Sequence, residues 1–227
     1  MNRKVTMTFH ARLLADTKAA EAEFLAIPII NRTLSDGIEG PTYLAYLGEA
    51  YHHVRHTCPL LALAYARCRE DDGTYREALL EYIDEERGHE MWILDDIRAL
   101  GGDAATIARG RGGQAVRIMV GYAYYAIEHI SPFALLGMVH VLEGVSAKIA
   151  TQAAAAIQSS LGLTSLGGFS YLISHGALDK DHVAFFEGVV NTITCPRKQQ
   201  HIIDTAVIMY RLFGNVFRDL ESGKTSG

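Results

Sequence analysis

The stretch His175-Gly-Ala-Leu-Asp179-Lys-Asp-His182 has the pattern H-x-x-x-D-x-x-H within a segment that is otherwise largely apolar. An α-helix advances about 100° per residue, so His175, Asp179 and His182 fall within a sector of roughly 60° on one helical face. A polar triplet that faces an apolar interior is costly unless a partner satisfies it. Imidazole and carboxylate are natural ligands of iron, manganese and zinc. The stretch predicts a metal-binding helix, and a partly exposed polar face without a ligand stays open as the alternative.

The rest of the chain also has helical periodicity, and no segment shows the sustained alternation of a strand. Proline and glycine punctuate this pattern at the expected helix boundaries. The sequence predicts one all-α domain of about seven helices over residues 1–221, and a disordered tail at 222–227. The expected helical segments are 9–25, 28–35, 41–56, 59–69, 74–100, 114–129, 132–160, 169–192 and 196–220. Of these, 28–35 would be a short piece, and 41–56 with 59–69 would form either one long helix with a proline kink or two stacked helices.

Composition excludes several classes of function. The 227 residues carry a net charge of −5 without a run of lysine or arginine, which argues against a nucleic-acid partner. The three cysteines lack C-x-x-C spacing, so we expect reduced thiols and a cytoplasmic protein. Neither a signal peptide nor an apolar run of about 18 uncharged residues is evident, so no membrane span is expected.

Three further carboxylates stand in helical segments. Glu86 and His89 form an E-x-x-H pair, a spacing that recurs in helical bundles that hold two irons or manganeses. Glu143 follows eleven residues that contain one histidine and no other ionisable group. Glu49 belongs to a segment rich in tyrosine and histidine. Taken singly, each could be a solvated charge or an ordinary ion pair.

Together these residues indicate more than one metal. Three histidines and four carboxylates from four helices are too many ligands for one catalytic metal and about right for two. A mixed set without thiolates favours non-haem iron, with manganese possible, over structural zinc. The predicted ligands are Glu49, Glu86, His89, Glu143, His175, Asp179 and His182.

At these positions the chain resembles the haem-oxygenase-like di-iron oxidases and oxygenases, which are relatives of the TenA proteins and of the pyrroloquinoline-quinone synthase PqqC. The match is E…E-x-x-H…E…H-x-x-x-D-x-x-H, in the same helix order, over roughly 40–220. The resemblance implies a seven-helix, haem-oxygenase-like fold that holds two irons and no haem. It implies that Glu86, His89 and His182 serve one iron, that Glu143, His175 and Asp179 serve the other, and that Glu49 bridges them.

The function implied by this resemblance is oxidation of a small metabolite with O2 in a biosynthetic pathway, supported by an electron donor. The substrate would be like an amino acid, an amine or a fatty acid. The alternatives are a p-aminobenzoate synthase like the chlamydial death-domain-associated protein, a metal-free enzyme of the TenA or PqqC type, and a non-catalytic interaction protein. The chlamydial branch has a tyrosine on its first helix, whereas residues 9–25 here contain none.

A second, less specific set of residues could line a substrate pocket. Aromatic residues and histidines at helical spacing are more often ordinary core, and an arginine is more often exposed. The candidate pocket residues are Tyr46, His53, Phe133, His140, Tyr171 and Arg211.

Apolar residues on the outer face of the last helix suggest a homodimer.

Overall fold

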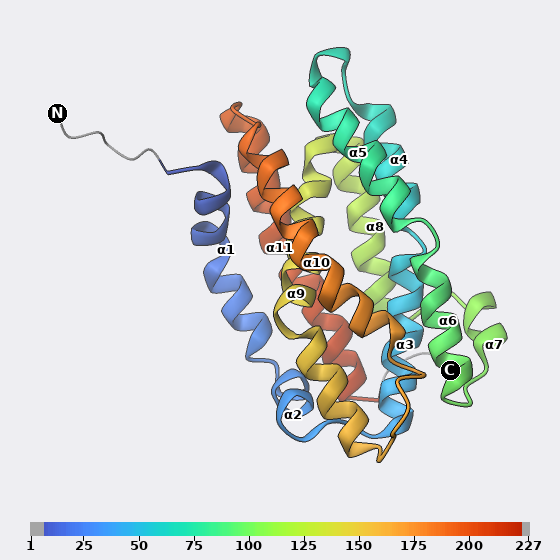
Figure 1. Cartoon of the computed structure of the whole chain (residues 1–227). Coiled ribbons are helices and arrows are strands. Elements are labelled where there is room, and N and C mark those ends of the chain that lie inside the picture. Colours follow the sequence, from blue (N-terminus) through green and yellow to red (C-terminus); the bar gives the residue numbers. More distant parts are fainter. Residues whose placement is uncertain (1–6, 224–227) are drawn as a thin grey trace.

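The computed structural model describes residues 7–223, apart from the side chains of residues 176–181. This part of the chain is helical and contains no strand (Figure 1). Two short 3-10 helices lie at Glu70–Asp72 and Pro132–Ala134. The α-helices are α1 (Phe9–Leu25), α2 (Pro28–Asp36), α3 (Gly40–Val54), α4 (Thr57–Arg67), α5 (Gly73–Glu86), α6 (His89–Ala99), α7 (Ala104–Arg109), α8 (Gln114–His129), α9 (Leu135–Ser160), α10 (Ser170–Asn191) and α11 (Pro196–Glu221).

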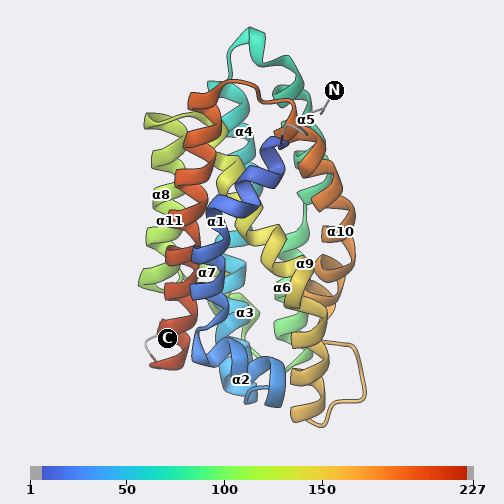
Figure 2. The same cartoon turned by 90° about the vertical axis from the view of Figure 1, so that its left-hand side faces the viewer.

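The long helix α9 is the centre of the bundle. It packs against α10, α11 and α2, while α11 also packs against α1 and α8 (Figure 2). Helices α9 and α11 approach closely at Gly137, where an added Cβ atom would lie 2.5 Å from the carbonyl oxygen of Ile202. The absence of a side chain at Gly137 therefore allows the two longest helices to pack against each other.

Helix α9 also resembles a membrane span by length and composition. The segment Pro132–Ser160 has a mean hydropathy of 1.5 in its most apolar stretch, and 56% of that stretch is buried in the protein. Its packing against three neighbouring helices accounts for its apolar character as that of a core helix.

Several predicted helix starts are confirmed. Pro28 and Pro196 stand in the first turns of α2 and α11. Ser131 caps the 3-10 turn before α9 by accepting a hydrogen bond from the backbone N–H of Phe133. Of the predicted tail 222–227, residues 224–227 lie outside the described part of the chain.

The prediction of one helix over 74–100 was wrong. The segment divides into α5 and α6 at Arg87-Gly88, because Gly88 has a φ of +95° that no continuous right-handed helix contains. Helix α7 was not predicted, and Asp103 caps it through the backbone N–H of Thr106. The described residues therefore form eleven α-helices, more than the expected seven.

Candidate metal centre

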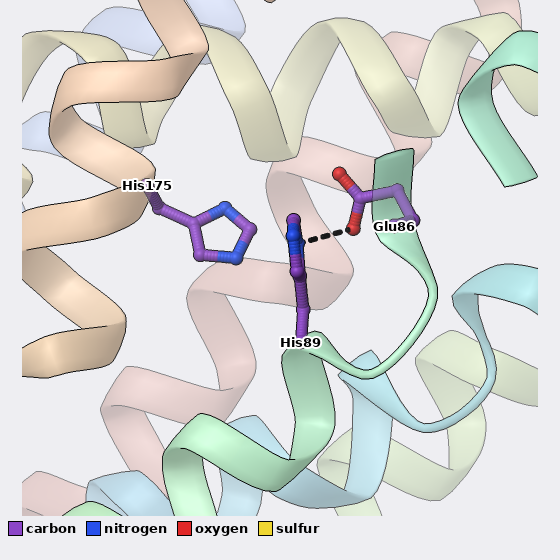
Figure 3. Close-up of side chains that lie close together, drawn as sticks. All are labelled: Glu86, His89 and His175. Carbon is purple, nitrogen blue, oxygen red and sulfur yellow. Dashed lines mark ion pairs between the residues drawn. The ribbon is translucent and has the colours of Figure 1, made fainter. Parts of the chain in front are cut away.

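Glu86, His89 and His175 converge from three helices. Each offers a ligand atom within 4.8 Å of the others, and Figure 3 shows the two imidazoles and the carboxylate turned toward one another. The Nδ1 atom of His89 lies 3.2 Å from Oε2 of Glu86, and both side chains are less than a tenth exposed. Because Glu86 ends α5 and His89 begins α6, the helix break itself brings the two candidate ligands together.

A second triplet consists of Glu86, Glu143 and His182, whose ligand atoms also lie within 4.8 Å of one another. The Nδ1 atom of His182 lies 3.9 Å from Glu86 Oε1 and 3.7 Å from Glu143 Oε1. Glu86 belongs to both triplets, and its two oxygens face different histidines. A carboxylate in this position is suited to bridge two metal ions.

The grouping differs from the expected division of ligands. His175 groups with His89, and His182 groups with Glu143, so the two histidines of α10 exchange places relative to the prediction. The physical reason is their separation of seven residues, about 10 Å along the helix axis. His175 consequently lies near the start of α6, whereas His182 lies near the end of α5. The side chain of the third predicted ligand of α10, Asp179, lies outside the described residues.

The predicted bridging residue Glu49 is not part of either triplet. Its buried carboxylate accepts hydrogen bonds from the backbone N–H of Gly113, at 3.0 Å and 2.9 Å to its two oxygens. Burial raises the pKa of Glu49, and the Gly113 N–H partly opposes this rise. Glu49 thus holds the start of α8 against α3, which explains its burial without a metal.

Two contacts of the site were not predicted. Glu85 is 41% exposed, yet its Oε2 lies 3.4 Å from Nε2 of His182. This carboxylate can orient the imidazole from the side opposite the cluster, as carboxylates commonly do for metal-binding histidines. Trp92 stacks on His89, with ring centroids 4.0 Å apart. In the sequence, this contact was indicated only by the position of Trp92 three residues after His89, which places the two side chains on one helical face.

Asp96 fixes the start of the helix that carries His175. Its carboxylate accepts hydrogen bonds from the backbone N–H groups of Ser170 and Tyr171 and from the Ser170 hydroxyl, at 2.7 to 2.9 Å. These donors belong to the first turn of α10, where helical N–H groups have no partner within the helix. The packing of α10 on α6 thereby positions His175 next to His89.

The candidate pocket residues divide into two groups. Tyr46, His53 and Tyr171 line interior cavities beside the cluster. Burial lowers the pKa of His53 to about 4, and the nearby His175 adds to this effect, so its imidazole is neutral at neutral pH.

The other three residues lie elsewhere. Phe133 stacks on Tyr75, with ring centroids 4.5 Å apart. His140 lies 3.1 Å from the hydroxyl of Thr17 on α1, and Arg211 is exposed on α11. None of the three lines a cavity that contains residues of the cluster.

The chemistry of the cluster fits bound metal. Glu86 and Glu143 bring two carboxylates into a site that is largely closed to solvent, with side chains 8% and 13% exposed. Buried carboxylates are costly unless cations compensate them. Among the described residues, histidines are the partners that Glu86 and Glu143 meet in ion pairs, and no lysine or arginine pairs with either. Imidazole and carboxylate donors without thiolate suit iron or manganese.

Comparison with solved structures identifies the fold of this chain. A domain of unknown function with a heme oxygenase-like fold from Shewanella denitrificans has a TM-score of 0.85 at 20% identity, covering 96% of this chain and 94% of that one. A TenA homologue from Pseudomonas syringae has a TM-score of 0.77 at 12% identity, covering 94% and 93%. A heme oxygenase from the cyanobacterium Synechocystis, in complex with heme, has a TM-score of 0.74 at 13% identity, covering 95% and 93%. These likenesses show the fold alone.

No curated protein matches the chain. A family defined by sequence does match it, over residues 44–214, and that range contains the two triplets in full. The match covers most of the chain, and the fold is the heme oxygenase-like all-α bundle expected from the ligand pattern. The chain belongs to the family of iron-containing redox enzymes.

Proposed function

We propose that this protein is a non-haem di-iron enzyme that uses O2 to oxidise a small metabolite. The observation that supports it most strongly is the pair of triplets, Glu86–His89–His175 and Glu86–Glu143–His182, that share one carboxylate. Each triplet supplies both nitrogen and oxygen donors. Glu86 has one oxygen near His89 of the first triplet and the other near His182 of the second. Membership of an iron-containing redox family agrees with this assignment.

The protein residues perform the binding and positioning. Glu86 would bridge the two ions, His89 and His175 would complete one site, and Glu143 and His182 the other. Asp179 is proposed as a further ligand on the evidence of its sequence position alone. Bound iron would supply the one-electron chemistry of O2 activation, which no side chain of this protein supplies. Manganese is compatible with the same donors.

The proposal is tested by titrating the metal-free protein with ferrous iron without oxygen and measuring the bound metal. We expect roughly two irons per chain, followed by a transient long-wavelength absorbance when O2 is admitted in a stopped-flow instrument. His175→Ala and His182→Ala should each remove about one iron, because each histidine belongs to a different triplet. Iron binding no higher than the background of an unrelated protein would contradict the proposal and favour a metal-free enzyme of the TenA type.

A further inference from the structure

Two interior cavities adjoin beside the metal centre. The first is a cavity of about 100 Å³ between α2, α3, α9 and α11. The second is a cavity of about 80 Å³ and has Glu86, Glu143 and His175 in its wall. Their common wall consists of His53, Leu142, Ser146 and Tyr171. We call the two adjoining cavities the chamber, which leads away from the metal centre into the bundle.

Helix α9 runs along the chamber from the metal centre. Glu143 lines the cavity at the metal, Ser146 lines both cavities, and Ala153 lines only the far one. At a rise of about 1.5 Å per residue, Ser146 and Ala153 lie roughly 10 Å apart along the helix axis. Small side chains at these two positions leave the space open, whereas leucine would fill it. The chamber is thus elongated, and its usable length depends on residues of one helix.

The two ends of the chamber differ in polarity. Among the described residues, no lysine or arginine lines either cavity, and the acidic residues in the walls are Glu86 and Glu143. In the far cavity, the hydroxyl of Thr33 already donates to the carbonyl oxygen of Ile29 at 2.7 Å. Water needs two to four polar partners to occupy a cavity, and this wall is largely aliphatic and aromatic. The far cavity therefore suits an apolar group.

Tyr82 is a buried polar residue at the metal end of the chamber. It is 1% exposed and lines the cavity that contains Glu86 and Glu143. Its hydroxyl makes no hydrogen bond to any described residue. Buried hydroxyls are normally paired, so this one is available to a bound molecule.

We propose that the chamber binds a molecule with a medium-length aliphatic chain, whose single polar end lies near Tyr82 and the metal centre, and that Ser146 and Ala153 set the chain length. The identification of this molecule as the substrate rests on the proposed function. The binding of this molecule does not rest on the proposed function, because its aliphatic chain contacts no proposed metal ligand in the far cavity. A substrate that is charged along its length, such as a free diamine or guanidine compound, would lack partners in this wall.

The test uses metal-free full-length protein and the neutral alcohols octanol, dodecanol and hexadecanol, which the buried carboxylates do not repel. Affinity is measured by displacement of the neutral fluorescent dye N-phenyl-naphthylamine. We expect saturable binding that strengthens from octanol to dodecanol and no further for hexadecanol. Ala153→Leu should weaken dodecanol about tenfold, the equivalent of two lost methylene contacts, and octanol less. Ser146→Leu should weaken both alcohols.

Ala155→Leu is the matched control, because Ala155 is exposed on the same helix and lines neither cavity. It should leave the affinity for every alcohol unchanged. The wild-type chain-length series needs no variant and tests the proposal independently of mutant folding. Absence of saturable binding, or equal losses for octanol and dodecanol in Ala153→Leu, would overturn the inference. The iron titration uses no alcohol. A failure to bind alcohols in the chamber and a failure to bind iron at the metal centre are therefore separate results.

Discussion

The carboxylate of Glu86 and the imidazole of His89 lie 3.2 Å apart across a break between two helices. In a continuous helix, residues three apart share a face and point to the same side of the axis. Here the left-handed backbone of Gly88 ends α5 and starts α6, so the two side chains approach from separate helices. This arrangement leaves the second oxygen of Glu86 facing His182 and places Glu86 in both triplets.

Removal of the Glu86 charge is expected to affect both metal sites. Glu86→Gln should reduce bound ferrous iron from roughly two per chain to well below one, because the shared carboxylate serves both triplets. The measurement is metal content after anaerobic loading. Glu81→Gln is the control, since Glu81 is exposed on the same helix and should retain full iron binding. Retention of one tightly bound iron in Glu86→Gln would show that Glu86 serves a single site.

The conformation of Gly88 provides a second prediction. Gly88→Ala should lower the free energy of unfolding by about 1 to 2 kcal/mol, because an L side chain is strained at positive φ. Space is not the cause, since an added Cβ atom at Gly88 meets no atom within 4 Å. Iron affinity should fall in parallel, as the break that joins Glu86 to His89 is disturbed.

Gly73→Ala is the control for this substitution. Gly73 starts α5 with a helical φ of −48° and has equally open surroundings. Alanine there should be neutral or stabilising. Urea unfolding of the three proteins compares the two sites, and an equal effect at Gly73 and Gly88 would contradict the backbone argument.

The sequence was informative where periodicity and local spacing determine structure. The all-α class and the H-x-x-x-D-x-x-H helix follow from apolar positions at helical period, and His175 and His182 do lie on one helix, beside Glu86, His89 and Glu143. The break at Gly88 was missed because the apolar pattern continues on both sides, at Tyr82 and Ile93, and a single glycine is tolerated in helices. The contact of Glu49 with Gly113 could not be predicted, because Gly113 lies 64 residues away. No local pattern reports such a contact.

The role of Glu49 can be decided by a neutral substitution. Burial raises the pKa of this carboxyl, which means that the site disfavours its charge. Glu49→Gln removes the charge and keeps an oxygen to accept from Gly113, so stability at neutral pH should be equal or higher. Iron binding should remain at the wild-type level. Loss of iron from a folded Glu49→Gln protein would restore Glu49 to the ligand set predicted from the sequence.

Asp96 is expected to support the metal centre from a distance. Asp96→Asn turns one of its acceptor oxygens into a donor that faces the N–H or hydroxyl groups of the first turn of α10. The expected loss of stability is about 1 to 3 kcal/mol, the usual cost of leaving a buried polar group unsatisfied. Thermal unfolding measures it. The neighbouring Asp95→Asn is the control, because Asp95 is exposed and forms an ion pair with Arg98 at the surface, and it should change stability by less than about 0.5 kcal/mol.

His140 should make the fold sensitive to acid. The hydroxyl of Thr17 donates its hydrogen to the Leu13 carbonyl, so its bond to His140 uses the Nε2–H of the imidazole as donor. Burial lowers the pKa of His140 to about 4, and His10 and Lys148 add to this effect. The unfolded chain has an ordinary histidine pKa near 6.5 and therefore binds more protons than the folded protein between these values. The stability that comes from the neutral imidazole is present above pH 6.5 and is lost as the pH falls toward 4.

The substitution His140→Phe removes this titration and keeps a ring against Phe186, the aromatic neighbour of His140. Between pH 7 and pH 5, the wild type should lose about 2 kcal/mol more unfolding free energy than the variant. Urea unfolding of both proteins at the two pH values measures the difference. His53 contributes a loss of the same sign, because its pKa is also lowered to about 4, and this loss persists in the variant. If the unfolding free energies of the two proteins changed equally with pH, His140 would not take up a proton on unfolding. That result would contradict the neutral imidazole expected from its buried position against Thr17.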